Sequence, residues 1–215
     1  MKKIVAVMPI KLNNERLPGK NTKLLGNKPL LQYELNTLLQ IKEISEIIVY
    51  CSNKEIVTYL PEGVRFVERP EYLDLPTANF TQIFETFMSA YDADIYIYAH
   101  ATAPFIKEST VRKCIDAVLK DEYDSAFCAE KIQDYLWKNG EPLNFDAENL
   151  PRSQDLEVMY RETSGVYVLK KEVFQKYKRR IGKKPFICEV DAKERIDINT
   201  YNDFLLAEKF LNVDL

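Results

Sequence analysis

The chain has 215 residues, of which 46% are hydrophobic and 29% charged, and these ordinary values exclude disordered and fibrous proteins. Its formal net charge of −3 disfavours nucleic acid as a partner, because DNA binding usually needs a broad basic face. No apolar run approaches the ~18 residues of a membrane span, and the run after Lys3 is interrupted at Lys11, too early for a secretory signal. We therefore expect a soluble, cytoplasmic protein that forms one domain over residues 1–215 and has no membrane partner.

The predicted elements alternate along the chain. Short apolar runs predict strands over 4–8, 47–50, 64–67, 95–98, 125–128 and 166–169. Apolar spacing near 3.6 predicts helices over 29–41, 54–60, 79–90, 108–120, 171–178 and 200–211, with Ser109 or Thr110 and Thr200 as starting residues. This alternation predicts a doubly wound α/β fold with a mainly parallel sheet and helices on both faces. Ligands of such sheets bind beyond the carboxyl ends of the strands.

Three further features bear on the organisation of the chain. Residues 131–163 are the least regular stretch, which we interpret as an excursion from the sheet and not as a second domain. The four cysteines are widely spaced without a C-x-x-C pair, which favours buried free thiols over a disulfide or zinc site. Because His100 is the only histidine, a metal would be held largely by oxygen, as magnesium and calcium are.

The loop after the first strand gathers positive charge and short amides. Residues 1–30 contain seven lysines and arginines against one acid, Glu15, a local charge of +6. Lys11, Arg16 and Lys20 follow the strand, together with the amides of Asn13, Asn14 and Asn21. The spacing is neither that of a Walker A loop nor that of a Rossmann dinucleotide site. This concentrated charge suits a small polyanion such as a nucleoside triphosphate, although solvated surface lysines are an equal alternative.

Four blocks of sequence then carry a family resemblance. They are residues 16–20 (RLPGK) followed by 24–30 (LLGNKPL), residues 102–105 (TAPF), residues 152–156 (RSQDL) with 160–167 (YRETSGVY), and residues 195–200 (RIDINT). In their order and spacing they resemble the signatures of the cytidylyltransferases that activate sialic acid and 3-deoxy-manno-octulosonate. The resemblance spans nearly the whole chain. It implies a three-layer, Rossmann-like fold of the nucleotide-diphospho-sugar transferase type.

The resemblance also implies an activity and a set of residues. The activity is magnesium-dependent transfer of CMP from CTP to an acidic sugar, with release of pyrophosphate, by a homodimer whose 131–163 excursion makes dimer contacts. Lys20 matches the catalytic lysine of the family, and Lys11 and Arg16 are further candidates for the triphosphate. The remaining nucleotide-binding candidates are Asn13, Asn14, Asn21, Thr77, Asn79, His100 and Thr102, and those for the acceptor are Gln154, Asp155, Arg161 and Thr163. The alternative to nucleotide binding at Thr77–Asn79 is an ordinary helix start. The alternative to acceptor binding by Arg161 is a structural ion pair.

Asp197 is the candidate metal ligand, because a carboxylate between two isoleucines needs a cation or hydrogen-bond donors. A cap for the helix near Thr200 is its alternative. Asn199 stands where the family has a second aspartate, and an amide oxygen can ligate magnesium but supplies no charge. Two alternatives therefore stay open: a nucleotidyltransferase for another small acid or a phosphorylated acceptor, and a nucleotide-sugar-binding protein that has lost turnover.

Overall fold

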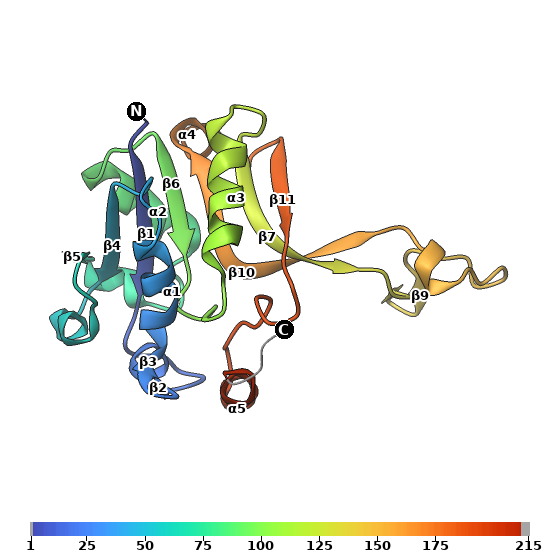
Figure 1. The fold of residues 1–215 in the computed structure, drawn as a ribbon, viewed down its shortest axis with the longest axis horizontal. Coiled ribbons are helices and arrows are strands. Elements are labelled where there is room, and N and C mark those ends of the chain that lie inside the picture. The colour runs from blue at the N-terminus through green and yellow to red at the C-terminus, as the bar shows by residue number, and fades with distance from the viewer. Residues whose placement is uncertain (1, 212–215) are drawn as a thin grey trace.

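The computed structural model describes residues 2–211, so the predicted domain 1–215 begins and ends outside the described residues. A seven-stranded sheet with the order β11-β7-β10-β6-β1-β4-β5 forms its centre (Figure 1). The strands of this sheet are β1 (Ile4–Ile10), β4 (Glu46–Cys51), β5 (Val64–Glu68), β6 (Ile95–Ala99), β7 (Ser125–Ile132), β10 (Met159–Lys170) and β11 (Pro185–Glu189). Two small hairpins pair β2 (Leu24–Leu25) with β3 (Lys28–Pro29) and β8 (Trp137–Lys138) with β9 (Glu141–Pro142).

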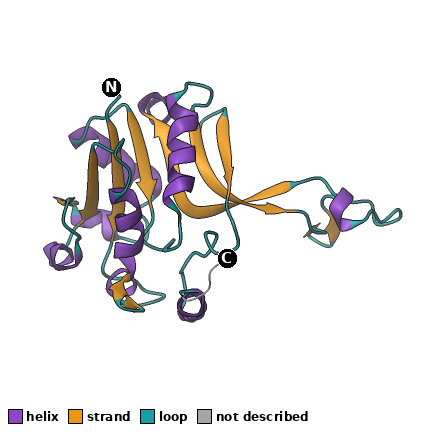
Figure 2. Cartoon of the chain, viewed as in Figure 1, coloured by secondary structure: helices purple, strands orange, loops and turns teal. Residues whose placement is uncertain are grey.

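Helices cover both faces of the sheet, which confirms the predicted α/β layers (Figure 2). The α-helices are α1 (Leu30–Leu39), α2 (Phe80–Ala90), α3 (Glu108–Leu119), α4 (Lys171–Tyr177) and α5 (Tyr201–Phe210). Residues of α1 and α3 share one hydrophobic cluster with alternate residues of β1, and residues of α2 and α4 share a second cluster with the others. Because successive strand residues face opposite sides, the all-apolar run of β1 is buried on both faces. None of the helices in the described part of the chain has the length and apolar character needed to cross a bilayer.

Four local predictions differ from the structure. The strand that we predicted over 166–169 is longer, and it runs antiparallel to both of its neighbours, β6 and β7. The predicted helix over 54–60 is a 3-10 segment, Lys54–Tyr59. Neither Ser109 nor Thr110 starts α3, because that helix begins at Glu108 with Lys107 in the capping position. The edge strand β11 was missed, since its apolar run, Phe186-Ile187-Cys188, is only three residues long and follows a basic segment.

Residues 133–158 form an arm that projects from the sheet (Figure 1). We expected this excursion over 131–163, but β7 continues to Ile132 and β10 begins at Met159, so the two strands occupy the ends of that range. The arm holds the β8–β9 hairpin and a 3-10 turn, Ser153–Asp155. The four cysteines are free and buried, as predicted.

A third hydrophobic cluster positions the loops at one end of the sheet. It joins Leu17 of the first loop and Leu25 of the first hairpin to Ile196, Ile198 and Phe204 near α5. Residues almost 180 positions apart in the sequence are thereby held side by side. This cluster places the first loop against the segment that contains Asp197.

Candidate active site

The first loop turns sharply at Gly19, whose φ of 65° lies in the left-handed region that favours glycine. The backbone N–H groups of Thr22 and Lys23 donate to the Gly19 carbonyl, which closes a short 3-10 turn, Lys20–Thr22. This turn buries the side chain of Lys20, and its Nζ donates to the Ile198 carbonyl at 2.8 Å. Burial lowers the pKa of Lys20, while the nearby carboxylate of Asp197 acts in the opposite direction.

The structure brings together the three cations that the sequence nominated for phosphate binding. Lys11, Arg16 and Lys20 line one pocket of about 210 Å³ with Asn14 and Asn199. The Asn14 side-chain oxygen is buried there and finds no hydrogen-bond partner in the described part of the chain. Asn21 lies just behind, and its amide donates to the Lys11 carbonyl at 3.0 Å, which fixes the shape of the loop.

Asp197 lies beside this pocket, and its two carboxyl oxygens have different surroundings. Its Oδ2 accepts hydrogen bonds from Ser164 Oγ at 2.8 Å and from the Asn199 amide at 2.6 Å. Its Oδ1 is buried and has no hydrogen-bond partner among residues 2–211, which is costly for a carboxylate unless a cation meets it. A hard cation such as magnesium, which prefers oxygen ligands, fits that atom. Within residues 2–211, no group of three or more His, Cys, Asp or Glu side chains could hold a metal by itself.

Asn199 links Arg16 to Asp197 through hydrogen bonds. Its Oδ1 accepts from Arg16 at 2.9 Å while its Nδ2 donates to Asp197. As a metal ligand, which the sequence suggested, Asn199 would have to exchange its bond to Arg16 for the metal. The helix cap is supplied by Thr200, whose side chain accepts from the Asp203 N–H, so neither Asn199 nor Asp197 serves that role.

His100 and Thr102 follow β6 (Ile95–Ala99) and contact residues next to Asp197. The Nδ1 atom of His100 lies 2.8 Å from the Ser164 carbonyl, and its ring is packed edge-on against Tyr98 and Tyr167. Burial lowers the pKa of His100, which favours the neutral ring. The Thr102 carbonyl accepts from the backbone N–H of Ile198 at 2.8 Å. Both residues therefore support the site through backbone contacts, and neither lines one of the pockets described.

A second pocket, of about 790 Å³, opens between the loops after β1 and β4. Asn13 lines it together with Leu12, Ser52 and Asn53. Of the two further residues predicted to contact the nucleotide, Thr77 is exposed outside this pocket. Asn79 caps α2 in a reciprocal pair with Gln82. The alternative interpretation of Thr77–Asn79, an ordinary helix start, therefore holds at Asn79.

The wall of this second pocket contains an ion pair that the sequence did not reveal. Arg69, which is 3% exposed, forms an ion pair with Asp74, and Ser52 Oγ donates to the same carboxylate at 2.5 Å. Asp74 also lines the pocket. Because Arg69 is buried, removal of either partner would leave an uncompensated charge.

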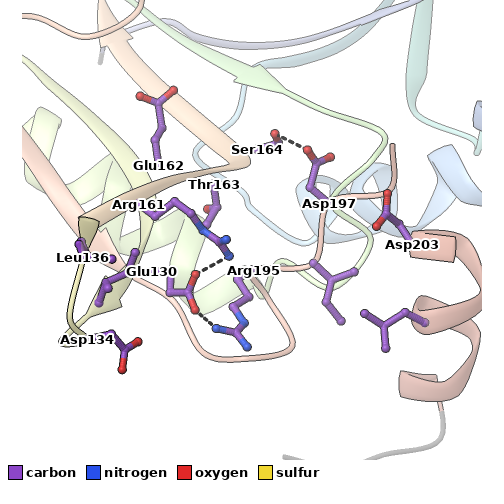
Figure 3. A pocket seen from close by; sticks show the side chains of 13 residues that line it. Glu130, Asp134, Leu136, Arg161, Glu162, Thr163, Ser164, Arg195, Asp197 and Asp203 are labelled. Carbon is purple, nitrogen blue, oxygen red and sulfur yellow. Dashed lines mark hydrogen bonds and ion pairs between the residues drawn. The ribbon is translucent and has the colours of Figure 1, made fainter. Parts of the chain in front are cut away.

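A third pocket, of about 670 Å³, lies on the other side of Asp197 (Figure 3). Arg161 and Thr163, two of the four predicted acceptor residues, line it. The register of β10 against β7 shifts between Glu162 and Tyr167, and this irregularity aims the side chains around Thr163 and Ser164 at the pocket. Gln154 and Asp155 lie on the arm, outside the pocket. The Gln154 carbonyl accepts from Gln133 there, and Asp155 pairs with Arg152.

Several charged residues of this third pocket escaped the sequence analysis. Glu130 on β7 forms ion pairs with both Arg161 and Arg195 (Figure 3). Arg195 lies within a block that carried the family resemblance, directly before Ile196-Asp197, and that position was its only signal. Glu162 lines the pocket and pairs with Arg180, which lies outside the lining and packs over the Tyr167 ring. Nothing in the local sequence of Glu130 or Arg180 indicates these contacts.

The sequence is similar to those of known cytidylyltransferases. The family model described as "Cytidylyltransferase" matches residues 5–210. The chain is 24% identical to N-acylneuraminate cytidylyltransferase A of Danio rerio over 96% of its length, and it spans 50% of that relative. It is 27% identical to the CMP-N,N'-diacetyllegionaminic acid synthase of Legionella pneumophila, covering 99% of this chain and 97% of the relative. The chain thus spans about half the length of several relatives it matches and nearly all of another.

Solved structures show the same fold. A CMP:2-keto-3-deoxy-manno-octonic acid synthetase complexed with CTP matches with a TM-score of 0.75 and 18% identity, over 97% of this chain and 98% of that one. The 4-diphosphocytidyl-2C-methyl-D-erythritol synthase of Anaerococcus prevotii matches with a TM-score of 0.70 and 17% identity, over 99% of each chain. These likenesses confirm the predicted Rossmann-like fold of the nucleotide-diphospho-sugar transferase type.

Proposed function

The chain belongs to the cytidylyltransferase family, and on that premise we propose that it transfers CMP from CTP to an acidic sugar. The acceptor would be a sialic-acid-like or other keto-sugar acid, pyrophosphate would be released, and the product would serve surface glycan synthesis. One observation carries the proposal: a pocket lined by Lys11, Arg16 and Lys20 adjoins Asp197, and the larger pocket with Arg161 adjoins Asp197 from the other side. Donor and acceptor would thus meet at Asp197.

The chemistry requires neutralisation of a growing negative charge. An acceptor hydroxyl oxygen bonds to the α-phosphorus of CTP and loses its proton, while the bond from that phosphorus to the oxygen bridging to the β-phosphate breaks. Charge then builds on the departing pyrophosphate, and cations already in place lower the barrier. Lys20 suits this role because burial and its bond to Ile198 hold its ammonium group in one position. Arg16, oriented by Asn199, would contact the outer phosphates.

Magnesium is proposed as the metal of this site. The unpartnered Oδ1 of Asp197 would hold it. When bound, the cation would neutralise charge on the triphosphate and on the leaving pyrophosphate. Ser164 and Asn199 hold the carboxylate in place through its other oxygen.

Replacement of Lys20 by alanine tests the proposed function. Pyrophosphate release would be measured with CTP, magnesium and a panel of sugar acids. We expect a fall in kcat of about 10²- to 10³-fold for Lys20→Ala, the usual cost of one preorganised donor. Lys23→Ala is the matched control, because Lys23 lies in the same turn but is exposed and outside the phosphate pocket. Full activity of Lys20→Ala would contradict the assignment, whereas CTP binding without pyrophosphate from any acceptor would favour the binding-protein alternative.

We also propose that the protein is a homodimer whose contacts are made by the arm, residues 133–158. Its exposed apolar side chains include Trp137, which is 60% exposed, and Leu150, which is 63% exposed. Such side chains on a projecting arm favour burial against a second copy. Sedimentation velocity of the wild type and of a Trp137→Ser/Leu150→Ser variant tests this, and a monomeric wild type would contradict it.

The cytoplasm is the proposed location, because four free cysteines suit a reducing compartment.

A further inference from the structure

Strand β10 carries extra residues at the point where it contacts Asp197. The chain advances five positions from Glu162 to Tyr167, whereas the paired stretch of β7, from Ala129 to Phe127, advances only two. β10 therefore bulges away from β7 by three residues, and a bulge of this kind re-aims the side chains that it carries. Because the bulge interrupts the pairing of the two strands, other contacts have to hold its shape.

The residues of the bulge connect β7 to Asp197. Thr163 Oγ1 donates to the Cys128 carbonyl of β7 at 3.0 Å. Ser164 Oγ donates to Asp197 Oδ2 at 2.8 Å. A Cβ added at Gly165 would lie 3.1 Å from Cys128 Sγ, so a larger residue there would push the bulge away from β7. The position of the Asp197 carboxylate therefore depends on the shape of the bulge.

Tyr167 joins the two ends of the bulge from the face of the sheet that α2 and α4 cover. Its hydroxyl donates to Glu162 Oε1 at 2.5 Å and lies 3.1 Å from the Thr163 carbonyl oxygen. Burial and the hydrogen bond to Glu162 raise the pKa of Tyr167, so the hydroxyl keeps the proton that it donates. Glu162 points away from the ion pairs of the third pocket (Figure 3).

Arg180, in the loop between α4 and β11, contacts both residues that flank the bulge. Its guanidinium carbon lies 3.9 Å from the centre of the Tyr167 ring, and the group forms an ion pair with Glu162. Arg180 lies outside the lining of the pockets described above. Any effect of Arg180 on the site would therefore be transmitted by Glu162 and Tyr167.

We propose that Arg180 is a positioning residue of the active site. By holding Glu162 and Tyr167 together, it fixes the bulge. The fixed bulge lets Ser164 orient the Asp197 carboxylate through Oδ2, and Oδ1 is then left for the magnesium proposed at this site. This inference rests on the proposed function. It predicts that Arg180, which touches neither nucleotide nor metal, changes the contribution of magnesium to CTP binding.

A double-mutant cycle on the full chain tests the proposal. The dissociation constant of CTP would be measured by calorimetry with saturating magnesium and with EDTA, which requires neither an acceptor nor turnover. Ser164→Ala and Arg180→Met should each weaken magnesium-dependent binding about tenfold, a usual cost of losing an outer partner of a metal ligand, and leave binding in EDTA unchanged. The double variant should bind no more weakly than Ser164→Ala, since Arg180 acts through Ser164.

Two further variants separate positioning from folding. Arg180→Lys keeps a charge for Glu162 but loses the flat contact with the Tyr167 ring, so it should weaken binding less than Arg180→Met, and it replaces that variant in the cycle if Arg180→Met does not fold. Arg179→Met is the matched control, because Arg179 donates to the Gly182 carbonyl instead and should change neither constant. Thermal unfolding of each variant confirms that it is folded.

Three results would overturn the proposal: a double variant that binds about tenfold more weakly than Ser164→Ala, an equal loss with magnesium and with EDTA, or a wild type whose CTP binding does not respond to magnesium. Pyrophosphate release tests the proposed function separately. If the cycle gives the expected result but no acceptor yields pyrophosphate, the proposed transfer fails and the positioning role of Arg180 stands.

Discussion

The carboxyl group of Glu34 should lower the free energy of unfolding progressively as the pH rises. It lies on α1 with no exposed surface, and neither of its carboxyl oxygens makes a hydrogen bond of ordinary geometry to any residue that the structure describes. Burial raises the pKa of Glu34 well above its ordinary value of 4.5, with a contribution from Cys128 in the same direction and an opposing one from the His100 backbone. Folded chains therefore keep a proton on Glu34 that unfolded chains release above about pH 4.5.

The magnitude follows from this difference in proton binding. Between pH 4.5 and the raised pKa of the folded state, the unfolding free energy falls by about 1.4 kcal/mol per pH unit. Glu34→Gln has nearly the same shape but cannot ionise, so this slope should disappear. The free energy of unfolding of the variant, relative to that of the wild type, should therefore rise by about 2.7 kcal/mol over two pH units within that window.

Urea unfolding followed by far-UV circular dichroism at pH 5.5, 6.5 and 7.5 measures the effect. Glu46→Gln is the control, because hydrogen bonding to Lys3 lowers the pKa of Glu46, and neutralising it should reduce stability above pH 4.5 instead. If wild type and Glu34→Gln keep a constant difference in unfolding free energy across this range, Glu34 is not buried as a proton-binding carboxyl and the reasoning is wrong.

Three further substitutions have expected outcomes. Asp197→Asn should reduce pyrophosphate release at least ~100-fold at any magnesium concentration, because the charged oxygen that would hold the proposed cation is lost; recovery at high magnesium would contradict this. Arg69→Met should cost about 3–5 kcal/mol in urea unfolding by leaving Asp74 unpaired, and adding Asp74→Leu should restore most of it. Thr200→Ala should cost about 1 kcal/mol by removing the cap of α5, measured by the same method, and no loss would show that the cap is dispensable.

The sequence by itself determined the layers of the fold and the gathering of positive charge in the loop after β1. Consecutive apolar residues predicted the buried strands, and periodic ones predicted five α-helices within a few residues of their observed ends. Thr200 was correctly placed at a helix start because a cap acts on backbone within its own turn. Lys11, Arg16 and Lys20 could be nominated together because they share one short loop, and neighbours in sequence cannot separate far in space.

Only the tertiary structure decided which charged side chains meet in the third pocket and which are buried. Arg161, Glu130 and Arg195 meet through the register of β10 against β7 and the path of the chain before α5. Glu34 has a helical position that the pattern assigns to the interior, but the pattern does not reveal what its carboxyl faces. The periodicity of hydrophobic residues indicates which side of a helix or strand is buried. Which side chains then meet across elements depends on strand register and packing, and those are fixed only when the whole chain has folded.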